Sequence, residues 1–469
     1  MLRHRVTRQD STLARVTAKS RKLGRLVAIA CIGLAAVCAI AVVVRHRPSL
    51  GLNRACWIDG KRHKLGEYHR PDLANTGLAL YQQAIAELDA LDPGQSIDLF
   101  WDFSAGRAPA AAVAGPLRDS AHVLDLVHAA ADEPYISPVD PLDSQGTLSP
   151  HYNSRIREIA RRLATKVRFE QTDDPPQALQ TSRDGLALAA NVMQWGGTHD
   201  THQAVAVAAT MQRQSGRALT GGGLSAEDLL RHAEYVRALR QRVPPMRGFL
   251  QWELVEIRHT LEYTSRDQAI DAYQQVMAME AAWHGEAPSD AAVPDGPWEP
   301  WRYVAWLEDR YARLSELCEE PLGASAARIE ELIGRTPGDA DAAHDPVFTV
   351  MRPAVQLQAA HSWLKLHALL LGEETMACLE AYHVRKGAYP GTLGELVPDF
   401  MPELPPDPWG GGPMRYRREG SAYRLYSVGP DLVDDGGSRE RGVTKYHHQR
   451  DFVIMPLEPD RHLTPPVTR

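Results

Sequence analysis

The sequence has few cysteines, and this excludes a fold built on disulfide bonds. Its 469 residues include five cysteines, too few and too widely spaced for a framework of bridges. Cys31 and Cys38 lie within an apolar run, which leaves Cys56, Cys318 and Cys378 outside it. An odd number of thiols at wide spacing favours free or buried cysteines, and one disulfide is the alternative.

Familiar catalytic and nucleotide-binding motifs are also missing. The chain has no Gly-x-Ser-x-Gly elbow, and the three glycines at 221–223 are not followed by the Lys-Ser/Thr of a phosphate-binding loop. His199 and His202 have the spacing of two metal ligands, but they lack the glutamate of the zincin motif and a third ligand. His199 also fits the start of a helix. The pair His447 and His448 lies in a polar segment that is typical of a solvated loop.

One stretch of sequence offers acid–base chemistry. Glu253, Glu256 and His259 are spaced to lie on one side of a helix, where they could exchange protons with a substrate. The same pattern is typical of a solvated helix face. An enzyme is therefore one of three functions that the sequence leaves open.

Basic residues are concentrated at the N-terminus. Residues 1–25 contain eight Lys or Arg and one acid, although the whole chain has a net charge of −7. The remainder is therefore acidic, which gives no electrostatic footprint for nucleic acid. Residues 45–72 form a basic linker, which we expect to lie close to anionic lipid headgroups.

An apolar run of nineteen residues, Leu26 to Val44, follows the basic tail. As a helix it is long enough to cross the roughly 30 Å core of a bilayer. The excess of basic residues before the run places the N-terminus in the cytoplasm. Because the residues at 45–48 make a poor signal-peptidase site, we expect a permanent single-pass anchor in the inner or cytoplasmic membrane. The body would then be extracytoplasmic (periplasmic).

Amphipathic runs joined by short loops occupy residues 73–350. Ser225 precedes two acids, a typical helix start, and Leu229, Ala233 and Val236 keep the spacing of one apolar face. No clean 34-residue repeat occurs, so we predict an irregular α-helical array with antiparallel neighbours. The expected runs are 153–169, 178–195, 198 onward, 225 onward, 246–263, 267–283, 300–318 and 324–333, followed by a long helix over 355–386.

The long helix leads into the most specific pattern of the chain. Lys365, Glu373 and Glu374 interrupt its apolar sequence, so it cannot cross a membrane. Gly387, which accepts positive φ, is expected to end it.

Several short motifs follow in a fixed order. A short apolar turn is expected at 393–397, a Pro- and Gly-containing turn at 407–410, and a β-hairpin from 414–418 and 422–428 around Gly420. A strand-to-loop corner, 425–431, ends the series.

The order and spacing of these motifs, over about sixty residues, resemble the globular head of the major pseudopilins of type II secretion systems. The resemblance implies that residues 351–469 form a small α+β head with an antiparallel sheet. One departure is clear: pilins have a glycine cleavage site followed by a glutamate in the N-terminal apolar helix, whereas the first glutamate here is Glu67. The whole arrangement is similar to uncharacterised membrane-anchored bacterial proteins with a helical domain and such a head.

The same resemblance implies a calcium site in the loop after the corner. Calcium accepts six to eight oxygen ligands in flexible geometry. Arg450 replaces an aspartate of the family, and the basic insertion 438–449 opposes a cation, so a solvated turn is the alternative. The candidate ligands are Asp431, Asp434, Asp435 and Asp451, with main-chain carbonyls of Ser427 and Val428.

Three functions follow from these expectations. The first is a membrane-anchored, noncatalytic binding or scaffold protein with a calcium-stiffened head. The alternative is an accessory component of a type II secretion or pilus-like system, which would dock against pseudopilins. The third is an envelope enzyme. The expected partners are the membrane, through Leu26 to Val44, and envelope proteins or pseudopilins, but no nucleic acid.

Overall fold

The computed structural model describes residues 66–68, 72–91, 93–104, 106–138, 150–194, 196–284, 293–319, 345–351, 354–430, 432–437 and 452–455. The predicted anchor, the helix expected at 324–333, and the calcium candidates Asp431 and Asp451 lie outside these residues. Among the helices in the described ranges, none combines the length and the apolar character that crossing a bilayer requires. The anchor therefore stays a prediction.

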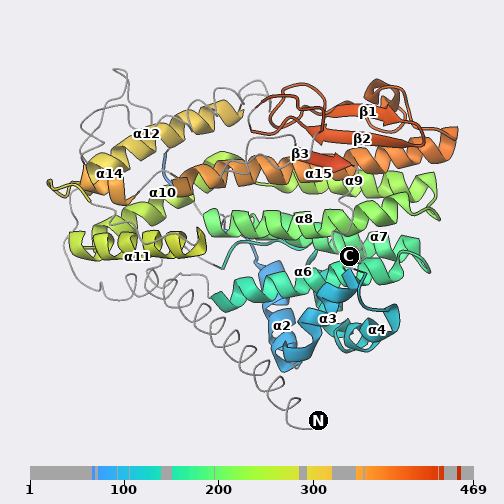
Figure 1. Cartoon of the computed structure of the whole chain (residues 1–469), viewed down its shortest axis with the longest axis horizontal. Helices are drawn as coiled ribbons and strands as arrows, with labels where there is room; N and C mark the ends of the chain where they lie inside the picture. Colours follow the sequence, from blue (N-terminus) through green and yellow to red (C-terminus); the bar gives the residue numbers. More distant parts are fainter. Residues whose placement is uncertain are drawn as a thin grey trace, which may run out of the picture.

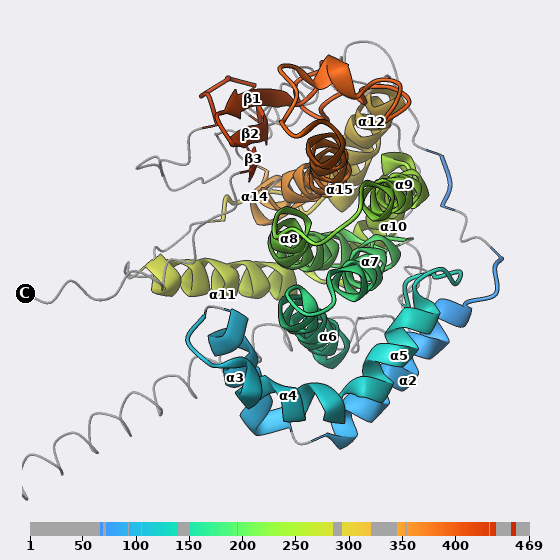
Figure 2. The same ribbon diagram turned by 90° about the vertical axis from the view of Figure 1, so that its right-hand side faces the viewer.

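Four helices at the start of the described chain curve around one side of the molecule (Figure 2). They are α2 (Thr76–Ala90), α3 (Pro93–Ser104), α4 (Ala110–Asp119) and α5 (Ala121–Ala130). Three aromatic rings of α3 lie beneath guanidinium groups of the next helix, α6 (Pro150–Glu170). The ring-to-guanidinium distances are 5.1 Å for Phe100 and Arg162, 5.4 Å for Trp101 and Arg161, and 5.5 Å for Phe103 and Arg168. Cation–π attraction therefore helps to hold this arc against α6.

The central helices lie side by side (Figure 1). After α6 come α7 (Pro175–Val192), α8 (Thr198–Thr220) and α9 (Ala226–Arg242), which match the predicted runs. The Asp228 N–H donates to the Ser225 hydroxyl oxygen at 3.1 Å, so the predicted cap of α9 is confirmed. The short loops between these helices make α7 a neighbour of both α6 and α8.

A second group of helices packs at one end of the array (Figure 1). It contains α10 (Met246–Tyr263), α11 (Arg266–His284), α12 (Pro300–Glu319) and the short α14 (Pro346–Val350). Two rings of α12 contact Phe348 of α14. The centroid of the Phe348 ring lies 5.2 Å from that of Tyr303 and 5.5 Å from that of Trp306. The bounds of α10 equal those of the predicted run 246–263, which is confirmed. The predicted runs 267–283 and 300–318 are confirmed within one residue at each end.

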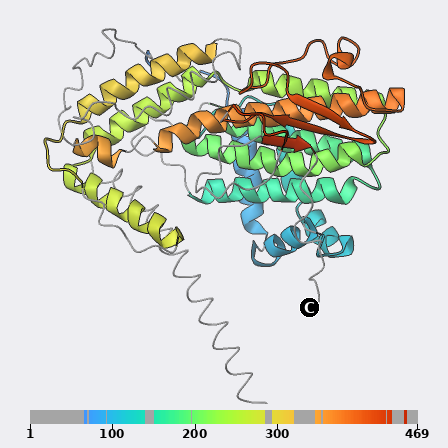
Figure 3. The same cartoon turned by 45° about the horizontal axis from the view of Figure 1, so that its top comes forward.

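Helix α15 (Ala354–Lys386) is the longest of the described helices. Every residue from Leu366 to Ala381 is buried, and a helix that is buried on all sides belongs to a core. One side packs on α8 and α9, and the other packs on the sheet (Figures 1 and 3). The helix ends at Gly387, which has a φ of +75° as predicted.

The C-terminal part forms a three-stranded antiparallel sheet in the order β1 (Arg415–Glu419), β2 (Ala422–Ser427), β3 (Phe452–Met455). The two-residue turn between β1 and β2 has Gly420 at a φ of +66°, and Ser421 is not among the residues with positive φ, a combination that is typical of a type II′ turn. The short 3₁₀ helix η2 (Leu393–Leu396) fills the predicted turn before the sheet. The predicted fold, mainly helical with a small antiparallel sheet, is confirmed.

The inner face of the sheet shares one core with the helices. Tyr423, Leu425 and Ile454 pack in the same cluster as Leu179 of α7 and Leu229 of α9. Gly372 of α15 permits this contact, because a Cβ there would come within 2.6 Å of Ile454. The sheet is therefore packed directly on the helical array.

Candidate functional site

The structure places the described part of the predicted calcium loop against the outer face of the sheet. Asp434 accepts a hydrogen bond from the Tyr426 hydroxyl at 2.7 Å and from the Gly436 N–H at 3.0 Å through Oδ1. Its Oδ2 accepts from Arg415 Nε at 3.1 Å. These contacts lower the pKa of Asp434, and the hydrogen bond from Tyr426 has the largest effect. Both oxygens of this carboxylate already have protein donors.

The two residues predicted to offer carbonyls both contact Asp407. The buried Ser427 hydroxyl donates to Asp407 Oδ1 at 2.6 Å, and the Val428 N–H donates to Asp407 Oδ2 at 3.2 Å. Burial raises the pKa of Asp407. The sequence indicated only a turn at Asp407, because its partners lie about twenty residues further along the chain.

The described residues alone do not make a calcium site. Over the ranges that the structure covers, no group of three His, Cys, Asp or Glu side chains is placed to hold a metal ion. Asp435 is exposed on the loop. Calcium binding therefore stays a prediction that depends on Asp431 and Asp451.

A group of buried and half-buried ionisable side chains, which sequence reasoning missed, joins α15 to α9. Glu373 Oε1 lies 3.0 Å from His232 Nε2, and both side chains are 0% exposed. The second polar atom of each, Glu373 Oε2 and His232 Nδ1, is buried with no hydrogen-bond partner in the described structure. We call His232, Arg237, Arg240, Glu373 and Glu374 the junction.

The other half of the junction surrounds Glu374. This carboxylate is also 0% exposed, and it accepts from Arg237 Nε at 2.7 Å and from Arg240 Nη2 at 3.3 Å. Burying an ionised carboxylate is costly unless it is paired. Two arginines of α9 supply that pairing and fix the rotation of α15 against α9.

A third buried acid of α15 connects it to the C-terminal part of the chain. The Tyr389 hydroxyl lies 3.0 Å from both oxygens of Glu380, and the Tyr423 hydroxyl donates to Oε1 at 3.1 Å. Burial raises the pKa of Glu380 to about 7, although the tyrosine hydrogen bonds oppose this rise. Glu380 thus ties the helix to the segment after Gly387 and to β2.

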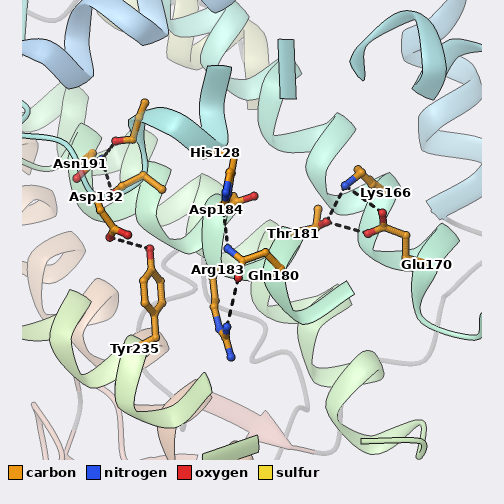
Figure 4. A network of polar contacts seen from close by, with 12 residues as sticks. His128, Asp132, Lys166, Glu170, Gln180, Thr181, Arg183, Asp184, Asn191 and Tyr235 are labelled. Carbon is orange, nitrogen blue, oxygen red and sulfur yellow. Dashed lines mark hydrogen bonds and ion pairs between the residues drawn. The ribbon is translucent and has the colours of Figure 1, made fainter. Parts of the chain in front are cut away.

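A polar network on another side of the molecule joins α5, α6, α7 and α9 (Figure 4). The exposed His128 contacts the buried Asp184 through Nδ1 at 2.9 Å, and Gln180 Nε2 donates to the same oxygen at 3.1 Å. The Tyr235 hydroxyl donates to Asp132 at 3.2 Å. A carboxylate that orients an imidazole is one part of a general-base arrangement.

The neighbouring hydroxyl does not complete that arrangement. Thr181 donates to Glu170 Oε2 at 2.8 Å and accepts from Lys166 Nζ at 3.1 Å, in a separate part of the network (Figure 4). In the described structure, Asp184 is the one hydrogen-bond partner of His128. The network links four helices, α5, α6, α7 and α9, and it does not present a nucleophile to the imidazole.

The two glutamates of the acid–base group predicted on α10 differ in their contacts. Glu253 is buried and accepts from the Tyr311 hydroxyl of α12 at 2.9 Å, whereas the Glu256 side chain is exposed. Desolvation by the surrounding protein raises the pKa of Glu253 to about 8 and, together with the charge of Asp200, the pKa of Glu256 to about 7. Glu253 therefore lies at a packed contact between two helices. His199 lies in the first turn of α8, which agrees with its interpretation as a helix-start residue.

Comparison of the chain with family models, with curated proteins and with solved structures gives no match. The function must therefore be inferred from the arrangement of the residues themselves.

Proposed function

We propose that this protein is a membrane-anchored, extracytoplasmic, noncatalytic scaffold or binding protein. Residues 26–44 would hold it in the inner or cytoplasmic membrane, and the helical array would hold the sheet in a fixed position for partners in the envelope. Calcium, bound through Asp431, Asp434 and Asp451, would stiffen the loop beside the sheet.

The observation that carries this proposal is the burial of α15 between the array and the sheet. Its residues Leu366 to Ala381 are all buried, and Glu373 and Glu374 are paired with side chains of α9. The opposite side of the same helix contacts β2 and β3. Because one rigid helix lies in both cores, the sheet is held in a defined orientation, as a scaffold requires.

The same burial favours a scaffold over a pilus subunit. In the pseudopilins that the C-terminal part resembles, packing into a pilus uses the N-terminal helix. We propose that α15 takes the place of that helix in this protein. In the structure, α8, α9 and the sheet cover its central residues. A helix covered in this way offers no surface to a neighbouring subunit. Docking of the sheet against true pseudopilins, as an accessory component, is the second candidate, and the resemblance of residues 380–437 supports it.

Copurification tests the proposal and separates the two candidates. The full-length protein, tagged after Arg469, would be cross-linked in cells, extracted from membranes with detergent and purified, beside an unrelated single-pass protein with the same tag. We expect envelope proteins that the control does not capture. Pseudopilins among them would favour the accessory role, and a set of proteins identical to that of the control would contradict both.

Membrane topology is tested separately. A reporter that is active only outside the cytoplasm, fused after Arg469, should be active, and added protease should digest the body in cells stripped of any outer layer. Protection of residues 70–469 in right-side-out vesicles would contradict the proposed location.

A further inference from the structure

Strand β1 forms an edge of the sheet. In the described part of the chain it pairs with β2 alone. Because the turn has two residues, the adjacent pair, Glu419 and Ala422, is hydrogen-bonded, and such pairs then alternate along the strand. The main-chain N–H and C=O groups of Tyr416 and Arg418 consequently point away from β2. No main-chain hydrogen bond within the described ranges occupies that side.

The hairpin that contains this edge is basic, although the chain is acidic. Residues 415–427 contain four arginines and one glutamate, whereas the whole chain has a net charge of −7. The exposed Arg418 donates one hydrogen bond in the described structure, to the Gly420 carbonyl at 3.4 Å, and its charge lowers the pKa of Glu395. Arg417 is 61% exposed and pairs with Glu419 on its own strand. The nearby acids offset most of this charge: Asp434 pairs with Arg415, Glu419 pairs with Arg417 and Arg424, and Glu395 lies within electrostatic reach of Arg418. Four arginines against three acids leave the edge with a small net positive charge, and Arg418 is the arginine without an ion pair in the described structure.

Charged edges usually prevent strand addition, because a second copy of the same strand is repelled. The same charges attract a strand of opposite sign, and an added strand gains affinity from main-chain hydrogen bonds and specificity from its side chains. We infer that the β1 edge binds an extended acidic segment of a partner protein by strand addition. This inference rests on the proposed binding function and names the class of partner.

The geometry favours a peptide over a nucleic acid. An edge strand presents donors and acceptors in alternation, and a second peptide strand matches both. A phosphate backbone offers acceptors alone, so the outward carbonyls of Tyr416 and Arg418 would have no partner. The acidic remainder of the chain also repels a long polyanion.

A binding experiment with the full-length protein in detergent tests this inference. The probe is a fluorescein-labelled peptide of eight residues in which Glu and Thr alternate, and binding is followed by fluorescence anisotropy. Three comparison probes are used: the peptide with Lys in place of Glu, an analogue with alternate N-methyl groups that block one hydrogen-bonding edge, and single-stranded DNA. We expect the acidic peptide to bind at least about tenfold more tightly than each of them.

Two substitutions at one position separate charge from main-chain pairing. Arg418→Ala removes the guanidinium, and Arg418→Pro also removes the outward N–H while leaving the pairing with β2 in place. We expect Arg418→Ala to weaken binding about threefold and Arg418→Pro a further fivefold or so. Arg231→Glu on α9, where the side chain is 66% exposed, is the matched control and should bind as the unmodified protein does. Circular dichroism confirms that each variant is folded.

Other outcomes overturn the inference. Equal binding of the acidic and basic peptides, equal affinities of the Ala and Pro variants, or tighter binding of DNA would each exclude strand addition by an acidic peptide. If Arg418→Pro still captures the same envelope proteins in the cross-linking experiment, the scaffold function stands and the β1 edge is not its binding site.

Discussion

The junction and the outer face of the sheet use the same chemical groups in different surroundings. In the junction, Glu373 and Glu374 are 0% exposed and meet His232, Arg237 and Arg240. On the outer face, Asp434 meets Arg415 at 3.1 Å, and the two side chains are 43% and 41% exposed. Similar distances therefore join pairs with very different access to water.

Access to water determines how much each ion pair stabilises the fold. Water screens an exposed pair and competes with it, so such pairs contribute about 0–1 kcal/mol. Removing one partner of a buried pair leaves an uncompensated charge and costs about 3–5 kcal/mol. We therefore expect the contacts of the junction to contribute most to the free energy of unfolding. The ion pairs on the outer face should contribute little, so their side chains can pair with a binding partner instead.

The largest expected effect is on the junction itself. Glu373→Ala leaves both ring nitrogens of His232 buried without a partner, and we expect the free energy of unfolding to fall by about 3 kcal/mol. Urea denaturation of the full-length protein measures this change. The matched control is Glu227→Ala, which removes an exposed pair with Arg385 and should leave the midpoint of urea denaturation nearly unchanged, because water screens this pair.

A double substitution tests whether the loss comes from the unpaired polar group or from packing. Replacing both partners with apolar residues, as in His232→Leu with Glu373→Met, should recover most of the loss, because no buried polar group is then left without a partner. A double variant as unstable as Glu373→Ala would show that packing, and not the unpaired polar group, determines the effect.

The second effect depends on pH and concerns Glu380. Its pKa is raised from the ordinary 4.5 to about 7 by burial, which corresponds to about 3 kcal/mol. Below about pH 4.5 both states hold the proton, so this group does not change stability. As the pH rises towards 7, the unfolded state loses the proton first, and stability falls until the folded state also ionises.

The variant Glu380→Gln isolates this contribution. It cannot ionise, so its stability should fall less than that of the unmodified protein between about pH 4.5 and 7. Parallel stability curves for the two proteins over this range would show that Glu380 is already ionised when folded.

The third effect concerns the contact of α15 with the sheet. Gly372→Ala places a Cβ within 2.6 Å of Ile454, and we expect a loss of about 2 kcal/mol from overpacking. Thermal melting measures the change. Adding Ile454→Val should restore part of the loss, whereas Gly115→Ala on α4, where a Cβ meets nothing within 4 Å, is the control that should not destabilise.

The fourth effect decides what holds the loop beside the sheet. If Asp431 and Asp451 complete a calcium site, calcium at tenfold excess over its Kd should stabilise the protein by about 1.4 kcal/mol. Magnesium should do so less, because it demands a stricter geometry, and Asp431→Ala should abolish the calcium effect. Unchanged melting after addition of a chelator would mean that Arg415 and Tyr426 hold the loop without an ion.

The smallest effect is expected on the outer face. Asp434→Asn weakens the exposed pair with Arg415 but leaves an acceptor for Tyr426, so stability should fall by less than about 1 kcal/mol. Melting curves at low and high salt test this, because salt screens an exposed pair. A loss comparable to that of Glu373→Ala would contradict the distinction between the two regions.

Local signals in the sequence determined the elements. Ser225 marks the start of α9 because its hydroxyl accepts a hydrogen bond from the N–H of Asp228, three residues later. Gly387 ends α15 because glycine accepts positive φ. Gly420 likewise sets the turn of the hairpin. Each of these interactions joins residues that are close in the sequence, so a short stretch of sequence is enough to predict it.

The tertiary structure alone decided what the acids of α15 do. In the sequence, Glu373 and Glu374 only interrupt an apolar helix, whereas in the fold they hold α15 against α9. Their partners His232 and Arg237 lie 141 and 137 residues earlier in the chain. Asp434, which is predicted as a calcium ligand, meets Arg415, which lies 19 residues before it. A buried charge takes the partner that folding brings to it, and no local pattern of residues specifies that partner.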